Sequence, residues 1–218
     1  LESLKDTEAL MEKYPFVYGA FGIHPDDADK MTEETLEEIR KLCKLPKAVA
    51  VGEIGLDYYW HKEEHEHEIQ KKMFRAQMEI AREAQMPFMI HSREAAKDTL
   101  DIVKDCMKGG MYGGIIHCFS YAKEMAREYL DMGLYLGIGG VVTFKNAKKL
   151  KEVVEYAPLD QIVLETDSPY LSPEPNRGKR NDSRNLVYVA REIARIKGVT
   201  EDEVIAVTEG NAERLLLR

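Results

Sequence analysis

Short apolar runs that alternate with segments of helical spacing are the feature that most constrains the fold of this chain. The runs cover residues 16–23, 48–55, 87–90, 112–119, 134–140 and 161–166. They are nearly continuous in apolar character, as expected for parallel strands that are covered on both faces. Helices are expected over residues 31–43, 62–85, 94–107, 123–132, 146–156 and 185–197. This alternation predicts a (β/α) barrel.

Two of these helical segments carry more detailed predictions. In residues 62–85, one apolar stripe is expected to face the strands. It consists of Ile69, Met73, Ala76, Ile80 and Ala84. Near the C-terminus, Thr200 and Glu203 have the spacing of a capping box, which predicts the start of the last helix.

The length of the chain limits how the barrel is built. An eight-unit barrel needs about 250 residues, whereas this chain has 218 and only six apolar runs. Six units do not close a cylinder whose strand number, tilt and shear are linked. The expected fold class is α/β, a TIM (β/α)8 barrel that here lacks the first two βα units. A doubly wound open sheet is the alternative, but it would gather ligands at one switch point instead of on successive strands.

Four side chains that commonly bind metals come after short apolar stretches of these runs, namely AVAV, PFMI, GGII and IVLE. The four side chains are Glu53, His91, His117 and Asp167. In a parallel barrel they would meet at the C-terminal rim, where barrel enzymes keep their chemistry. A lone strand-end histidine is more often a core residue, and a lone carboxylate there often caps a helix. Four at repeated positions instead favour a divalent-metal hydrolase, because oxygen and nitrogen ligands suit Zn, Mn, Mg or Fe and a carboxylate can bridge two ions.

Composition bounds the compartment and the partners. No linker or change in composition divides residues 1–218, so a single domain is expected. No apolar stretch approaches the roughly 18 residues that suggest a membrane span. Three cysteines, far apart and without a CxxC pair, favour a reducing compartment, and the cytoplasm is predicted. A net charge of -8 argues against a protein that coats nucleic acid electrostatically, although a local basic site remains compatible with it.

Several short sequence words closely resemble the TatD family of metal-dependent deoxyribonucleases, which belongs to the amidohydrolase-like barrel superfamily. They are GIHP (22–25), VGEIGLDYY (51–59), IHSR (90–93), HCFS (117–120), GIGGVVTF (137–144), LETDSPYL (164–171), NRGKRND (176–182) and NAERLL (211–216). The resemblance runs from about residue 14 to the C-terminus. It implies a (β/α)8 barrel, one or two divalent ions (Mg, Mn or Zn) and hydrolysis of DNA ends, typically as a 3′-to-5′ exonuclease.

The resemblance also implies roles for the four candidate ligands. Glu53 is expected to bridge the metals, and His91 and His117 to bind the second metal. Asp167 is similar to the aspartate that binds the first metal and orients or deprotonates the attacking water. Glu53 and Asp167 are therefore the expected catalytic residues.

Substrate contacts are predicted for His24, Arg93, Arg177 and Tyr58. His24 matches the GxHP histidine beside the substrate, and Arg93 is placed to clamp a phosphate. Arg177 lies in a basic loop, whereas Tyr58, with Tyr59 and Trp60, is expected to stack a base. The alternative for His24 is strand-end hydrogen bonding, and that for Arg93 is a salt bridge. The alternative for Arg177 is a solvated charge run, and that for Tyr58 is packing of the loop.

Three other features receive structural interpretations. Asp57 is expected to orient a metal ligand. The glycines Gly137, Gly139 and Gly140 indicate close backbone approach, because no phosphate-loop pattern follows them. His61 and the His65-Glu66-His67 segment are expected to be solvated surface, since side chains two apart on a helix point in different directions.

The chain departs from the resemblance in one respect. TatD proteins begin with a strand that carries an H-x-H pair, and no such strand precedes residue 14. We expect the gene to encode roughly 40 to 50 further residues that supply the first two strands. The chain as written is expected to keep the second metal site, lose much of the first and show weak activity.

Three functions are therefore compared. The first is a phosphodiesterase that acts on DNA ends, with no membrane and no obligate protein partner. The second is an amidohydrolase-type enzyme that cleaves an ester, lactone or C–N bond, since one fold serves many reactions. The third is a non-catalytic barrel fragment, or a fragment completed by another chain. The basic residues near the expected metals favour the first.

Overall fold

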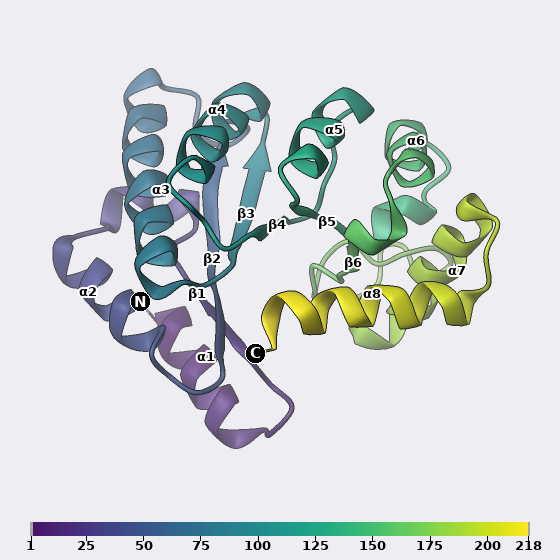
Figure 1. The fold of residues 1–218 in the computed structure, drawn as a ribbon, viewed down its shortest axis with the longest axis horizontal. Helices are drawn as coiled ribbons and strands as arrows, with labels where there is room; N and C mark the ends of the chain where they lie inside the picture. The colour runs from purple at the N-terminus through teal and green to yellow at the C-terminus, as the bar shows by residue number, and fades with distance from the viewer. Residues whose placement is uncertain (1, 218) are drawn as a thin grey trace. The chain divides into compact units, whose positions relative to one another are not determined.

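The computed structural model describes residues 2–217, in which helices and strands alternate along the chain (Figure 1). The strands are β1 (Gly19–Phe21), β2 (Ala48–Asp57), β3 (Phe88–Arg93), β4 (Gly114–Ile116), β5 (Tyr135–Ile138) and β6 (Ile162–Leu164). The α-helices are α1 (Glu2–Lys13), α2 (Glu33–Leu42), α3 (Glu64–Ala84), α4 (Ala96–Met107), α5 (Lys123–Asp131), α6 (Lys148–Tyr156), α7 (Leu186–Lys197) and α8 (Glu201–Leu216). Short 3₁₀ segments are η1 (Pro25–Lys30), η2 (Gly140–Thr143), η3 (Leu159–Gln161) and η4 (Ser183–Asn185).

The strand topology confirms the predicted α/β class. The order of the strands follows the order of the chain from β1 to β6. Pairing is parallel between β1 and β2, between β2 and β3, and between β5 and β6. A doubly wound sheet would reverse its order at a switch point, so the sequential order favours the barrel-like arrangement. None of the helices formed by residues 2–217 has the length and apolar character needed to span a membrane.

The chain divides into two compact units, one up to Ile115 and the other from Ile116 onward. The N-terminal unit contains β1 to β3 with helices α1 to α4. The C-terminal unit contains β5 and β6 with helices α5 to α8. That residues 1–218 form one domain stays a prediction.

In the N-terminal unit, α3 packs against β2 (Figure 1). The face of α3 that is buried differs from the predicted stripe. Ile80 is buried as predicted, but Ile69 is 37% exposed and Ala84 is also exposed. The buried face consists of Gln70, Phe74, Gln77, Met78, Ile80 and Ala81. The predicted stripe was therefore wrong. A pattern of apolar residues did not locate the buried face, because two of its positions are glutamines.

Both glutamines are buried because each one satisfies the backbone of a strand-end residue. Gln77 Oε1 accepts from Ile23 N at 2.7 Å, and its Nε2 donates to Ile23 O at 3.1 Å. Gln70 makes the same pair of bonds with Asp57, at 2.9 Å and 3.2 Å. Residues seven apart lie on one helix face. One face of α3 therefore fixes both the segment before His24 and the end of β2.

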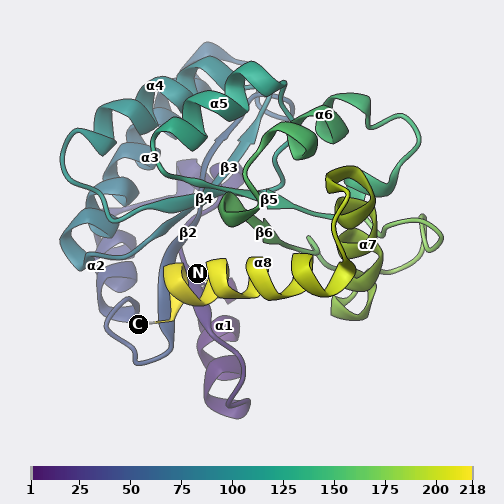
Figure 2. The same ribbon diagram turned by 45° about the vertical axis from the view of Figure 1, so that its right-hand side comes forward.

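In the C-terminal unit, α8 lies beside β6 and α7 in both views (Figures 1 and 2). Asn211 of α8 is fully buried, and its Nδ2 donates to Leu159 O at 2.9 Å and Ile162 O at 2.7 Å. This contact ties α8 to the start of β6. The predicted cap of this helix is present, since Thr200 Oγ1 accepts from Glu203 N at 3.1 Å.

Glu192 links two helices of the C-terminal unit and gives a pH-dependent prediction. Its carboxylate accepts from Arg195 and from Lys151 of α6, both at 2.9 Å. The Arg195 hydrogen bond, opposed by burial and assisted by Lys151, lowers the pKa of Glu192 to about 2 from its ordinary value of 4.5. Because the folded-state pKa is lowered, the stabilisation is present above pH 4.5 and is lost as the pH falls toward 2.

We therefore expect Glu192→Gln to lower the free energy of unfolding by about 1 kcal/mol at neutral pH. The difference from the unsubstituted protein should narrow as the pH falls from 4.5 toward 2. Urea unfolding at a series of pH values measures both quantities. Glu209→Gln, at an exposed position of α8, is the matched control. An equal loss in both variants, or a loss independent of pH, would contradict the assignment.

Candidate metal centre

Three side chains of the N-terminal unit bring nitrogen and oxygen donors together. His24 follows β1, Glu53 lies in β2 and His91 lies in β3. One donor atom from each lies within 4.8 Å of the other two, and the rings of His24 and His91 have centroids 4.5 Å apart. Imidazole and carboxylate ligands at this spacing suit a divalent ion. The structure thus places the predicted Glu53 and His91 side by side, with His24 beside them.

The positions of Glu53 and His91 within their strands differ from the prediction. Both were expected directly after a strand, but β2 continues to Asp57 and β3 to Arg93. The β2–β3 register shifts between Val51 and Ile54, a segment that contains Glu53. Such irregularities redirect side chains near functional sites.

Two glycines allow β2 and β3 to approach closely on either side of Glu53. A Cβ added to Gly52 would lie 2.6 Å from Met89 Cβ. A Cβ at Gly55 would lie 2.0 Å from His91 O, and the φ of Gly55 is +142°. The close approach next to His91 therefore requires glycine, which gives the GEIG word of the sequence a steric explanation.

Asp57 holds the ring of His91. His91 Nε2 donates to Asp57 Oδ2 at 3.0 Å, and His91 Nδ1 donates to Glu53 Oε1 at 3.0 Å. Asp57 is 1% exposed. A buried carboxylate that binds one ring nitrogen fixes the ring and directs the other nitrogen toward the metal position. This direct contact supports the prediction that Asp57 orients a metal ligand.

The charges of this cluster follow from the same contacts. Burial would lower the pKa of His91, but its hydrogen bonds to Asp57 and Glu53 raise it to about 9. Burial would raise the pKa of Asp57, but hydrogen bonds from His91 and from two backbone N–H groups lower it to about 2. Without a metal, His91 is therefore an imidazolium between two carboxylates. The proton between His91 Nδ1 and Glu53 Oε1 must leave before both atoms can bind one cation.

His24 has a different protonation state. Burial lowers its pKa, and the charge of His91 lowers it further. Its Nδ1 accepts a hydrogen bond from Asp26 N at 3.2 Å, so Nε2 carries the proton of the neutral ring. This tautomer offers a hydrogen-bond donor beside Glu53 and His91. It suits an oxygen of a bound substrate, as the sequence predicted for His24.

A second cluster lies in the C-terminal unit and contains the other two predicted ligands. His117 follows β4, and its Nε2 lies 3.6 Å from Asp167 Oδ1. His117 Nδ1 donates to Glu165 Oε2 at 2.8 Å, while Glu165 Oε1 accepts from Cys118 N at 2.8 Å. Glu165 thereby fixes the orientation of the His117 ring, with Nε2 facing Asp167. The structure places His117 and Asp167 together, as predicted.

Glu165 was not predicted as a site residue, and a glycine provides the space for it. A Cβ added to Gly137 would lie 2.1 Å from Glu165 Oε2. A Cβ at Gly140 would meet Leu171 O at 2.1 Å. The predicted close backbone approach is therefore confirmed at Gly140, whereas the nearest atom at Gly137 belongs to a side chain. The one sequence signal that could have pointed to Glu165 is a carboxylate at the end of an otherwise apolar run, two residues before Asp167.

Backbone contacts hold the loop that carries Asp167. Asp167 has a φ of +54°, an unfavourable conformation for a residue other than glycine. Buried Asn181 donates from Nδ2 to Thr166 O at 2.7 Å, and its backbone N donates to Pro169 O at 2.9 Å. These bonds support the strained position, and such strain often occurs at functional residues.

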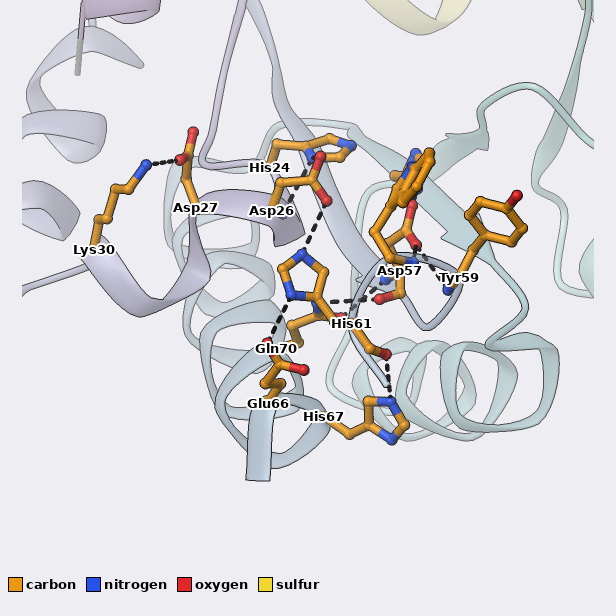
Figure 3. A network of polar contacts seen from close by, with 12 residues as sticks. His24, Asp26, Asp27, Lys30, Asp57, Tyr59, His61, Glu66, His67 and Gln70 are labelled. Atoms are coloured by element: carbon orange, nitrogen blue, oxygen red, sulfur yellow. Dashed lines mark hydrogen bonds and ion pairs between the residues drawn. The ribbon is translucent and has the colours of Figure 1, made fainter. Parts of the chain in front are cut away.

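The expectation of a solvated histidine surface was wrong for two of its members (Figure 3). His61 lies between Asp26 and Glu66, with one ring nitrogen 3.2 Å from each carboxylate. The ring of His67 stacks on Tyr58 with centroids 3.6 Å apart, and its Nε2 bonds to His61 O at 2.9 Å. These side chains fasten the loop before α3. His65 is exposed, as expected.

The predicted substrate residues lie in varied surroundings. Tyr58 donates to Asp98 at 2.8 Å, so it packs the loop, which was its alternative interpretation. Arg93 is exposed, with its guanidinium 4.1 Å from the centroid of Tyr59. Arg177 is exposed in the C-terminal unit, 4.2 Å from the centroid of Phe144. Contacts of Tyr58, Arg93 and Arg177 with substrate stay predictions.

Comparisons with known proteins identify relatives along the whole described chain. The family model "TatD related DNase" matches residues 1–217. The uncharacterized metal-dependent hydrolase YabD of Bacillus subtilis is 48% identical over 94% of this chain and 80% of its own length. The 3′-5′ ssDNA/RNA exonuclease TatD of Citrobacter rodentium is 33% identical over 97% of this chain and 81% of its own. The crystal structure of the Escherichia coli TatD homologue YjjV has a TM-score of 0.90 and 27% identity, covering 99% of this chain and 82% of its own.

The contact between Asp57 and His91 predicts the effect of a substitution on metal binding. Asp57→Asn keeps the side-chain shape but removes the charge that orients His91. We expect metal affinity to fall roughly 10- to 100-fold, as for other carboxylates that support histidine ligands. Calorimetric titration with Mn²⁺ measures the dissociation constant. Asp98→Asn, which alters a carboxylate that contacts Tyr58 and Lys71, should leave it nearly unchanged.

The charge of His91 predicts a proton release on metal binding. Because the pKa of His91 is raised to about 9, its ring must lose a proton before Nδ1 binds a metal near neutral pH. Metal affinity should therefore increase as the pH rises toward 9. Titrations in buffers of different ionisation enthalpy count the released protons. Binding without proton release at neutral pH would mean that His91 is not a ligand.

Proposed function

This chain belongs to the family of TatD-related DNases and is a metal-dependent hydrolase, and we propose that it removes nucleotides from the 3′ ends of DNA. The Citrobacter relative, a 3′-5′ exonuclease of single-stranded DNA and RNA, supports the nucleic-acid substrate. We further propose Mg²⁺, Mn²⁺ or Zn²⁺ as the cofactor, since the donors are carboxylate and imidazole groups. The cytoplasm is the proposed compartment.

The observation that carries this proposal is the pair formed by Glu53 and His91. Their donor atoms face each other at 3.0 Å, and a buried carboxylate holds the histidine from its other side. A donor arrangement that is fixed in advance in this way suits a centre that stabilises charge. When bound there, a divalent ion would supply a polarised phosphoryl oxygen and a more acidic water.

Other residues of the chain supply binding and proton transfer in this proposal. His24 Nε2 donates to a phosphoryl oxygen next to Glu53 and His91. Asp167 accepts a proton from the attacking water, and the Glu165–His117 hydrogen bond keeps the imidazole in the matching tautomer. That Glu53, His91, His117 and Asp167 serve one centre remains a prediction from the sequence.

Asp167→Asn tests the catalytic assignment. The substitution preserves volume and removes the base, so we expect kcat to fall at least 100-fold with the fold retained. The assay follows nucleotide release from 3′-labelled single-stranded DNA with Mg²⁺ or Mn²⁺, and with EDTA as a blank. Asp131→Asn, at an exposed position in α5, is the control.

Two results would contradict this proposal. An unchanged kcat in Asp167→Asn would remove that residue from catalysis. Turnover of a lactone or amide panel by the unsubstituted protein, without nucleotide release from DNA, would favour an amidohydrolase-type reaction instead.

A further inference from the structure

Two large aromatic side chains are exposed in the turn that follows β2. Tyr59 is 38% exposed and Trp60 is 65% exposed. Their rings meet edge to face, with centroids 4.7 Å apart and planes at 86°. Trp60 is the single tryptophan of the sequence. An exposed indole beside a polar centre resembles the aromatic positions that stack bases in proteins that bind single-stranded nucleic acid.

Arg93 packs on this aromatic pair. The central carbon of its guanidinium lies 4.1 Å from the centroid of Tyr59 and 5.6 Å from that of Trp60. Within residues 2–217, no carboxylate lies within ion-pair distance of this group. A guanidinium whose flat face rests on a ring keeps its N–H edge directed outward, where it can bind a phosphate through two hydrogen bonds.

The turn is fixed to the metal-binding cluster through Asp57. Asp57 Oδ1 accepts from Tyr59 N at 2.9 Å (Figure 3). The same oxygen accepts from Trp60 N at 3.0 Å, while Oδ2 accepts from His91. Arg93 is two residues beyond His91 on β3, and its carbonyl accepts from Tyr58 N at 2.9 Å. The buried carboxylate of Asp57 therefore fixes the positions of both the His91 ring and the turn that carries Tyr59 and Trp60.

We propose that the indole face of Trp60 stacks a nucleobase of single-stranded nucleic acid while Arg93 binds a phosphate of the same strand. Tyr59 supports the guanidinium from below. A base inside a duplex is covered on both faces by its neighbours, so this surface selects an unpaired strand. The inference rests on the proposed nuclease function and specifies the part of the substrate that is recognised.

Charge supports this choice of ligand over an apolar partner. Lys62 lies 5.1 Å from the centroid of Tyr59, so two cationic groups border the ring in a chain whose net charge is -8. Lys62 also lies 3.7 Å from Glu94, which leaves Arg93 as the group directed at a phosphate. A cation next to an exposed indole matches the alternation of phosphate and base along a strand.

The single tryptophan allows the contact to be observed directly. In EDTA, where metal-dependent cleavage is blocked, a short oligothymidylate is titrated into the protein and the tryptophan fluorescence is recorded. We expect quenching by the oligothymidylate but not by an abasic oligomer of the same length and charge. Absence of quenching by the oligothymidylate, or equal quenching by the abasic oligomer, would overturn the proposal.

Variants provide a second measurement by fluorescence anisotropy of a labelled oligothymidylate. Trp60→Ala should raise Kd about tenfold or more, and Trp60→Phe should raise it less because a ring remains. Arg93→Lys should also weaken binding, since it keeps the charge but loses the bidentate geometry. Phe16→Ala removes another exposed aromatic, at the opposite end of the strands, and should not change Kd. Equal Kd for Trp60→Ala and the unsubstituted protein would overturn the proposal.

The same proteins separate this inference from the proposed function. With Mg²⁺ present, binding and quenching without nucleotide release would sink the nuclease proposal and leave the stacking contact intact. Nucleotide release by Trp60→Ala with the same KM as the unsubstituted protein would support the nuclease proposal and overturn the stacking contact. Arg93→Ala should raise KM for DNA while metal content stays constant. Loss of metal in that variant would assign Arg93 a structural role and overturn its contact with phosphate.

Discussion

The buried carboxylate of Asp57 is the group on which the geometry of the N-terminal unit depends. Burial of a charge is unfavourable unless hydrogen bonds compensate for it. Here one oxygen accepts from His91, the other accepts from the backbone of Tyr59 and Trp60, and Gln70 holds the backbone of Asp57 itself. The residue therefore connects a metal ligand, an exposed aromatic turn and the buried face of α3. Function and local folding use the same set of contacts.

Much of the fold was predictable from the sequence because continuous apolar runs report burial on both faces of a parallel sheet. The six strands and their order follow from that pattern. The orientation of α3 did not, since a pattern of apolar residues treats glutamine as a surface residue. Gln70 and Gln77 are buried because the backbones of Asp57 and Ile23 offer each side chain a donor and an acceptor. Such pairing depends on tertiary contacts.

The candidate site was also predicted only in part, because some of its contacts depend on tertiary structure. Glu53 with His91, and His117 with Asp167, were expected near each other from their places along the strands, and each pair is close. Glu165 was counted as part of an apolar strand, and only the space left by Gly137 reveals where its side chain goes. The bonds of His61 were missed because Asp26 lies 35 positions away, and because the turn before α3 that brings Glu66 to the ring was not predicted.

Both units thus present an imidazole held by a carboxylate, His91 by Asp57 and His117 by Glu165. We infer that the first of these arrangements binds a divalent metal together with Glu53. Anomalous diffraction from crystals soaked in Zn²⁺ would show the ion itself. We expect an anomalous peak in contact with His91 Nδ1 and a Glu53 oxygen. A map with no peak at these atoms, or with zinc bound only elsewhere, would contradict it.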